Sequence, residues 1–163
     1  MVGATGLLFP NIIGSGHRLM DSFSLGMGLA FLCLILIGKY LISMVSYASG
    51  VPGGIFFPLL VLGASLGAVF ATIVISLFHL PSHLFANLVI LAMAGTFTAI
   101  VRAPMTGILL LVEMTGSFDH LLPLALVSLI AYVVADLLQS EPIYDSLLDN
   151  MLKAVSYTHL TLP

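Results

Sequence analysis

The chain has 163 residues, of which 60% are hydrophobic and only 7% are charged, and its mean hydropathy is +1.21. Soluble domains carry about 25% charged residues, so this composition excludes a water-soluble globular domain and indicates an integral membrane protein. The four basic and seven acidic residues are too few for a nucleic-acid-binding surface. The one cysteine, Cys33, excludes an intrachain disulfide and is best explained as a small buried hydrophobic residue.

Five apolar stretches follow a mixed lead-in at residues 1–22: residues 23–47, 55–80, 85–100, 105–115 and 121–138. The first two are long enough to cross a bilayer as helices, because a membrane-spanning helix needs about 20 mainly apolar residues. The third and fourth look short for a full span, and Val101-Arg102-Ala103-Pro104 separates them. Lys39 interrupts the first stretch, so we expect its side chain to snorkel to the interface or to face protein.

Gly63 and Gly67 lie four residues apart in the second stretch. This small-xxx-small spacing predicts close packing of that helix against a neighbour. The same glycines bracket Ser65 in a Gly-x-Ser-x-Gly pattern, for which His79 or His120 can be imagined as a base. A hydrolase nucleophile of this kind needs a strand-to-helix turn, whereas Ser65 lies in an apolar helical run. An intramembrane serine hydrolase is therefore a remote alternative.

Two breaks rich in Gly or Pro interrupt the apolar stretches. One is Ser49-Gly50-Val51-Pro52-Gly53-Gly54, and the other is the Arg102-Ala103-Pro104 segment. Irregular backbone inside a membrane is tolerated only where protein buries it or where it lines a cavity. A helix that begins after such a break points unpaired N–H groups and the positive end of its dipole at the site. The pattern therefore predicts discontinuous helices around an anion site near the membrane midplane.

Beyond the fifth stretch, Glu141-Pro142-Ile143-Tyr144 opens a short amphipathic helix. Its apolar face is predicted to comprise Leu147, Leu148, Met151 and Leu152. Residues 154–163 continue no earlier pattern, and we expect this tail to be non-native or disordered. The histidines show no spacing typical of metal ligands on one face, so no metal site is predicted. Outside the tail, which contains His159, they are His17, His79, His83 and His120.

Three segments resemble, in order, the motifs of the CLC family of chloride channels and chloride/proton antiporters. Gly53-Gly54-Ile55-Phe56-Phe57-Pro58 resembles the family's Gly-x-Phe-x-Pro selectivity segment. Arg102-Ala103-Pro104-Met105-Thr106-Gly107, continued by Val112-Glu113-Met114-Thr115, is similar to its Arg-Ala-Pro-Leu-Thr-Gly and Leu-Glu-Met-Thr block. Pro142-Ile143-Tyr144 resembles the start of its last helix. The resemblance extends over residues 8–153, and three motifs in order are highly specific.

This resemblance implies an all-α integral membrane protein with the CLC inverted-repeat fold and discontinuous helices. The chain resembles only the second half of that fold. The family's first half carries a Gly-Ser-Gly-Ile-Pro segment and a gating glutamate within Gly-Arg/Lys-Glu-Gly-Pro, and neither sequence occurs here. We therefore expect residues 1–153 to be the C-terminal half of a CLC membrane domain, which needs the N-terminal half of the same subunit to conduct. A non-functional truncated product is the corresponding alternative.

The resemblance also implies where the anion binds. The backbone N–H groups of Ile55 and Phe56 and the Tyr144 hydroxyl would hold it as neutral donors, so that the ion can still leave. Gly53-Gly54 would allow close backbone approach, and Pro58 would fix the break. Without the family context, Tyr144 would be read as an interfacial aromatic anchor.

By the same resemblance, the protein transports chloride as part of a chloride/proton antiporter, most plausibly in a bacterial plasma membrane. A passive voltage-gated-type channel is the alternative, because the glutamates that decide between the two belong to the absent half. The resemblance implies a homodimer with one pore per subunit and with residues 105–115 and 121–138 at or near the interface. It implies no enzymatic activity and no cofactor, with chloride as the transported ligand and protons as the second ion of an antiporter.

Arg102 and Glu113 lie in apolar surroundings, where a charged residue costs roughly 2.5–3.5 kcal/mol on insertion scales. We expect a structural role for both, through bonds to backbone groups freed at the break or to each other. A proton-relay role for Glu113 is less favoured, because the family's proton glutamates belong to the absent half.

Overall fold

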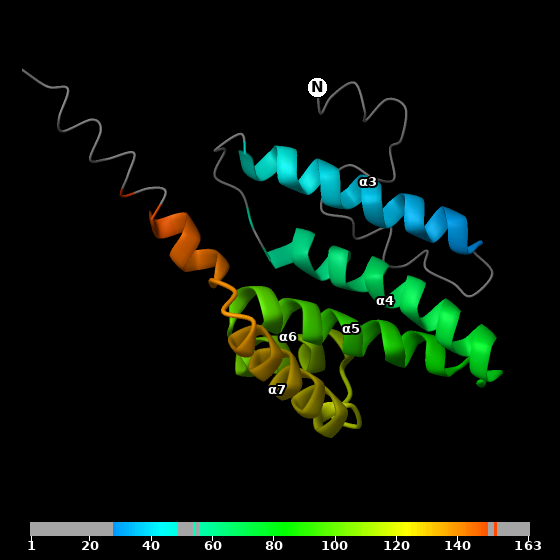
Figure 1. The fold of residues 1–163 in the computed structure, drawn as a ribbon. Coiled ribbons are helices and arrows are strands. Elements are labelled where there is room, and N and C mark those ends of the chain that lie inside the picture. The colour runs from blue at the N-terminus through cyan, green and yellow to red at the C-terminus, as the bar shows by residue number, and fades with distance from the viewer. Residues whose placement is uncertain (1–27, 49–53, 55, 150–151, 153–163) are drawn as a thin grey trace, which may run out of the picture.

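The computed structural model describes residues 28–48, 54, 56–149 and 152, and these residues form helices and turns with no strand among them. Figure 1 labels the helices α3 (Leu29–Ala48), α4 (Phe56–Phe78), α5 (Leu84–Val101), α6 (Pro104–Thr115) and α7 (Leu121–Leu137). Residues 143–149 form a further short helix, drawn in orange, which we call the Tyr144 helix. The all-α fold expected from the sequence is therefore confirmed.

Four of the five predicted apolar stretches agree with the helix bounds to within two residues, whereas α3 begins at Leu29, six residues after the predicted start. The third stretch is longer than expected, because α5 includes Leu84 and Val101. Both α4 and α5 have the length and composition needed to cross a membrane. The other apolar helices, α6, α7 and Leu29–Val45 of α3, are shorter. The predicted break between the third and fourth stretches is present, but the first break, at residues 49–53, and the tail at 154–163 lie outside the described residues.

Helices α4 and α5 lie side by side and share the largest helix contact of the molecule (Figure 1). Gly63 and Gly67 are buried on the face of α4 that meets α5. A Cβ atom at Gly67 would lie 2.9 Å from the Cα atom of Val89, and one at Gly63 would lie 2.9 Å from that of Met93. These distances leave no room for a side chain, so the small-xxx-small face predicted from the sequence is confirmed.

The main core lies where α4, α5, α6 and α7 meet. Its fully buried members include Leu60 of α4, Phe97 of α5, Leu111 of α6 and Leu124 of α7. A second cluster joins α3 to the α4–α5 pair and includes Leu32, Ala68, Ala71, Ile75 and Phe85. Lys39 is only 3% exposed, so this side chain of α3 faces protein instead of snorkelling.

Helices α5 and α7 run in the same direction, with α6 as the return segment between them (Figure 1). A Cβ atom on Gly95 would touch Val127 and Ala131, whereas Arg102, farther along α5, reaches the carbonyl oxygens of Tyr132 and Ala135. The C-terminal ends of α5 and α7 therefore meet at one end of the bundle. The start of α4 lies at this same end.

Candidate anion site and the end of helix α5

Helix α4 begins at Phe56, so the predicted anion-binding segment leads directly into a helix N-terminus. Pro58, in the first turn, is half-buried and has no backbone N–H, and proline is tolerated there because first-turn N–H groups have no intrahelical acceptor. Gly54 is exposed, with open space where a Cβ would lie, so the described contacts do not require glycine at this position. Ile55 and Gly53 lie outside the described residues.

The ring of Phe56 packs against Phe97, the large fully buried residue of α5. Their ring centroids are 5.3 Å apart with a tilt of 36°, a separation typical of favourable aromatic pairs. Phe97 is in turn confined by Gly107 of α6, where a Cβ atom would lie 2.9 Å from its Cδ1 atom. The start of α4 is therefore held by a ring whose own position is fixed by the core.

The break between α5 and α6 is built from three residues with different backbone requirements. Arg102 adopts the left-handed conformation with φ 62° and ψ 25°, and its N–H donates to the Thr98 carbonyl, which closes α5. The helical region is disfavoured for a residue that precedes proline. Ala103, which precedes Pro104, lies outside that region with φ −121° and ψ 78°. Pro104 then opens α6, where its missing N–H costs no hydrogen bond.

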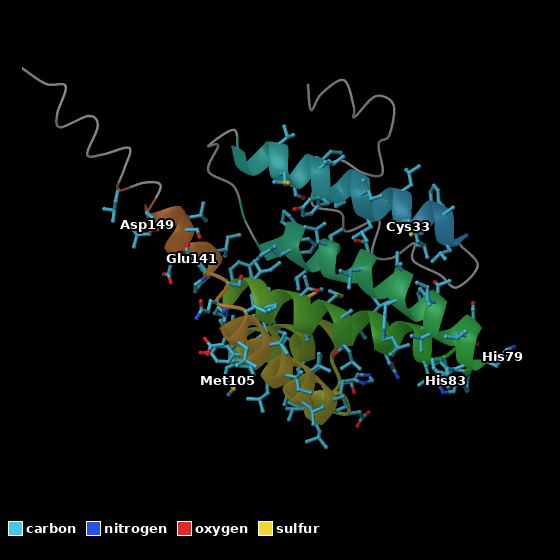
Figure 2. All side chains as sticks on the ribbon, viewed as in Figure 1. Cys33, His79, His83, Met105, Glu141 and Asp149 are labelled. Carbon is cyan, nitrogen blue, oxygen red and sulfur yellow. The ribbon has the colours of Figure 1, made fainter. Side chains whose placement is uncertain are left out.

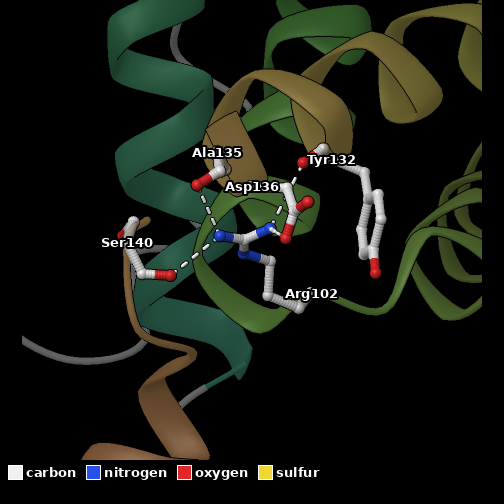
Figure 3. Close-up of polar contacts among 5 residues, drawn as sticks. All are labelled: Arg102, Tyr132, Ala135, Asp136 and Ser140. Atoms are coloured by element: carbon white, nitrogen blue, oxygen red, sulfur yellow. Dashed lines mark hydrogen bonds and ion pairs between the residues drawn. The ribbon is translucent and has the colours of Figure 1, made fainter. Parts of the chain in front are cut away.

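The guanidinium group of Arg102 binds the C-terminal end of α7 (Figure 3). Its Nη1 atom donates to the Tyr132 carbonyl at 3.2 Å, and its Nη2 atom donates to the Ala135 carbonyl and, at 2.8 Å, to the Ser140 carbonyl. The ion pair with Asp136 is longer, at 3.5 Å, and that carboxylate is 72% exposed. The Tyr132 ring lies 5.6 Å from the guanidinium carbon. Arg102 thus binds backbone oxygens at a helix C-terminus, where a cation is favourable.

Glu113 does not take part in this arrangement. It is exposed on α6, and no hydrogen bond or ion pair joins it to another described residue. The pairing of Arg102 with Glu113, one of the two expected arrangements, is therefore not formed in the described part of the chain. The reason is geometric: nine residues of helix separate Pro104 from Glu113, or about 13 Å along the axis.

Tyr144 lies in the first turn of the Tyr144 helix and is 44% exposed. The preceding residue, Ile143, packs against the main core, which includes Leu59 and Leu60 at the start of α4. Ser146 completes the turn, since its N–H donates to the Pro142 carbonyl at 3.2 Å and its hydroxyl donates to Glu141 at 3.3 Å. The structure thus brings the segment that carries Tyr144 to the end of the bundle at which α4 starts.

An open, mostly apolar hollow of about 790 Å³ lies beside this segment. Its walls come from α5 and α7, and the start of the Tyr144 helix closes one end. Polar groups are few, and the residues that bring them are Thr96, Ser140, Glu141 and Ser146. Arg102 and Tyr144 are not among the lining residues, but Ala135 and Ser140, whose carbonyl oxygens accept from Arg102, are.

The remaining candidates from the sequence lie away from this end. His79 and His83 are exposed at the turn between α4 and α5, at the far end of the bundle from Glu141 (Figure 2). The described residues contain no cluster of three or more His, Cys, Asp or Glu side chains able to hold a metal ion. Ser65 is buried inside α4, and its hydroxyl donates to the Leu62 carbonyl at 2.9 Å. No strand-to-helix turn surrounds it, which argues against a hydrolase nucleophile.

Comparison with known proteins gives the same family that the motifs indicate. Residues 1–136 match the family model described as "Voltage gated chloride channel". Over 99% of its length the chain is 38% identical to the H(+)/Cl(-) exchange transporter ClcA of Vibrio cholerae, and over 93% it is 36% identical to that of Klebsiella pneumoniae. The crystal structure of a slow cyanobacterial Cl⁻/H⁺ antiporter superposes with a TM-score of 0.76 at 35% identity, covering 86% of this chain.

The chain belongs to the voltage gated chloride channel family, the CLC family, and is a membrane protein with that fold. It spans only about a third of the length of these relatives: 35% of the Vibrio protein, 32% of the Klebsiella protein and 33% of the cyanobacterial chain. The contacts of Phe97 were not predicted from the sequence. Bonds from Arg102 to backbone groups were one of the two expected arrangements, but the residues that supply the carbonyl oxygens were not predicted. Phe97 stands in an apolar run without any distinguishing signal, and backbone acceptors leave no trace in a sequence.

Proposed function

We propose that this chain forms part of a chloride/proton exchanger, in which it supplies one side of a central chloride site. The backbone N–H groups of Ile55 and Phe56 and the hydroxyl of Tyr144 are the proposed donors to the anion. All three are uncharged, and a neutral site can desolvate an anion without holding it too tightly to release. Gly53-Gly54, which precede α4, and Pro58, in its first turn, are proposed to shape the backbone at this site.

One observation carries this proposal: the three segments that resemble CLC motifs meet at one end of the helical bundle. Helix α4 starts there at Phe56, the α5–α6 break lies there at Arg102, and the segment leading to Tyr144 is bound there through Ser140. The names of the relatives favour exchange over a passive channel.

The complete transporter is proposed to be a homodimer in a bacterial plasma membrane. Helices α6 and α7 each carry exposed large apolar side chains, which suit contact with a second subunit or with lipid. These side chains include Met105, Leu109, Leu122, Leu126 and Leu129. We propose that transport further requires the N-terminal half of the membrane domain; the Vibrio relative is about three times as long as this chain, which covers 35% of it.

Tyr144→Phe in the complete gene product tests the proposed site. Removing one neutral hydrogen bond, worth about 0.5–1.5 kcal/mol, should weaken chloride binding about 2- to 10-fold and loosen the coupling of chloride to protons. Binding is measured by titration calorimetry in detergent, and coupling by paired chloride and proton fluxes in liposomes. Tyr40→Phe is the matched control, because Tyr40 is 53% exposed on α3. Equal chloride affinity in the Tyr144 variant and the control would rule out this role for Tyr144.

A further inference from the structure

Arg102 binds the segment that precedes Tyr144 in the chain. Its Nη2 atom donates at 2.8 Å to the carbonyl of Ser140, which belongs to the short connection between α7 and the Tyr144 helix. The same Nη2 atom donates to Ala135, so one nitrogen joins the last turn of α7 to the connection that follows. Ile143 then packs on the core at the far side of this connection. Residues 140–143 are therefore fixed at both ends, immediately before Tyr144.

The helix that presents Arg102 also fixes the other proposed anion-binding element. Phe97 of α5 is fully buried and packs on Phe56, where α4 begins. Phe97 and Arg102 therefore connect the last turns of α5 to both sides of the proposed site. Helix α5 therefore links the segment before Tyr144 to the start of α4, and it can fix their relative position.

We infer that Arg102 is a positioning residue of the chloride site, which sets the place of Tyr144 relative to the N-terminus of α4. This inference rests on the proposed function. Arg102 does not need to touch the ion, because its two terminal nitrogens, Nη1 and Nη2, donate to the carbonyl oxygens of α7 and Ser140 and to Asp136. Its Nε atom is buried and has no hydrogen-bond partner among the described residues. Its side chain is only 11% exposed, so these acceptors replace water around the guanidinium.

The planar fork of donors, and not the positive charge, performs this role. A guanidinium donates to several acceptors in a fixed geometry, whereas an ammonium is a compact charge with rotatable donors. Lysine at position 102 would keep the charge near the site but could not bind Tyr132, Ala135 and Ser140 together. A mechanism based on long-range attraction of the anion would tolerate lysine, and the proposed mechanism does not.

The test compares Arg102→Lys and Arg102→Gln with Asp136→Asn in the complete gene product. Both Arg102 variants should lower chloride affinity about 10-fold, as expected when charged hydrogen bonds are lost. Asp136→Asn should change the affinity by less than about twofold, since the long ion pair is exposed and the three carbonyl bonds remain. Wild-type affinity in Arg102→Lys would overturn the inference, because charge alone would then suffice.

A double-mutant cycle with Tyr144→Phe separates positioning from general damage. If Arg102 acts through Tyr144, Arg102→Lys should weaken binding clearly less in the Tyr144→Phe background than in the wild type. Equal losses in both backgrounds would overturn the inference and leave the Tyr144 site intact. If Tyr144→Phe alone has no effect, the proposed site fails and the inference fails with it. Size-exclusion chromatography and far-ultraviolet circular dichroism identify folded variants, and either Arg102 variant suffices for the cycle.

Discussion

Replacing Gly67 with alanine is the sharpest test of the α4–α5 contact. An added Cβ atom would lie 2.7 Å from the Cβ atom of Ala92, 2.9 Å from the Cα atom of Val89 and 3.1 Å from the Val89 carbonyl oxygen. Two of these three atoms belong to the backbone, so no side-chain rotation can relieve the overlap. The two helices would have to move apart along their largest contact.

Two opposing effects set the size of the change. Alanine is favoured over glycine in a helix interior by roughly 0.5–1 kcal/mol, which would stabilise the variant. Overpacking of a tight contact costs typically about 1–3 kcal/mol. We therefore expect Gly67→Ala to lower the free energy of unfolding by about 1–2 kcal/mol. Gly63→Ala should behave similarly, because its Cβ atom would lie 2.9 Å from the Cα atom of Met93.

Gly95→Ala provides a control on α5, at its contact with α7 instead of α4. Its added Cβ atom would meet only side chains, with Val127 Cγ1 at 3.2 Å and Ala131 Cβ at 4.0 Å. A small rotation of Val127 can accommodate it, so the free energy of unfolding should stay within about 0.5 kcal/mol of the wild type. Unfolding is followed by circular dichroism during titration with sodium dodecyl sulfate in mixed micelles. Stability of Gly67→Ala equal to or above that of Gly95→Ala would refute the close packing of α4 on α5.

Two further substitutions test single residues by the same titration. Gly116 ends α6 with φ 62°, and a Cβ atom there would meet open space. Gly116→Ala should therefore lower the free energy of unfolding by about 1–2 kcal/mol, from the backbone conformation alone. An unchanged free energy of unfolding would refute the left-handed cap. Ser128→Ala should be neutral or stabilising by up to about 1–3 kcal/mol, because the buried hydroxyl has no hydrogen-bond partner among the described residues. A clear loss of stability would show that this hydroxyl does have a partner.

Much of the fold could be predicted from the sequence because the membrane imposes simple rules on it. Long apolar runs must form helices, since no water is present to satisfy an open backbone. The spacing of Gly63 and Gly67 marks a face of close approach, and the proline at position 104 marks the start of a helix. These features are local, so they can be read from neighbouring residues. Both ends of α4, α5, α6 and α7 followed to within two residues, whereas α3 begins six residues after the predicted start.

The contacts at the end of α5 could not be predicted in the same way. Arg102 bonds to acceptors that lie between 30 and 38 residues away, and three of them are backbone carbonyl oxygens that any residue could supply. Their position depends on how α7 lies beside α5, which no local pattern specifies. The sequence left open whether Arg102 would bind freed backbone groups or Glu113. The structure decides between these two, because α6 extends away from the break and carries Glu113 away from Arg102.

The placement of Arg102 reconciles two requirements of the proposed anion site. Breaking a helix or ending one within the bundle leaves carbonyl oxygens short of donors, and a buried guanidinium supplies several donors at once. A full positive charge beside the anion would hold it too tightly for transport. Directing that charge at the last turn of α7 places it on carbonyl oxygens at a helix C-terminus, where the helix dipole favours a cation, and the Ala135 carbonyl accepts from the Ser140 N–H as well. The proposed anion donors can then remain neutral, while the residue that positions them is charged.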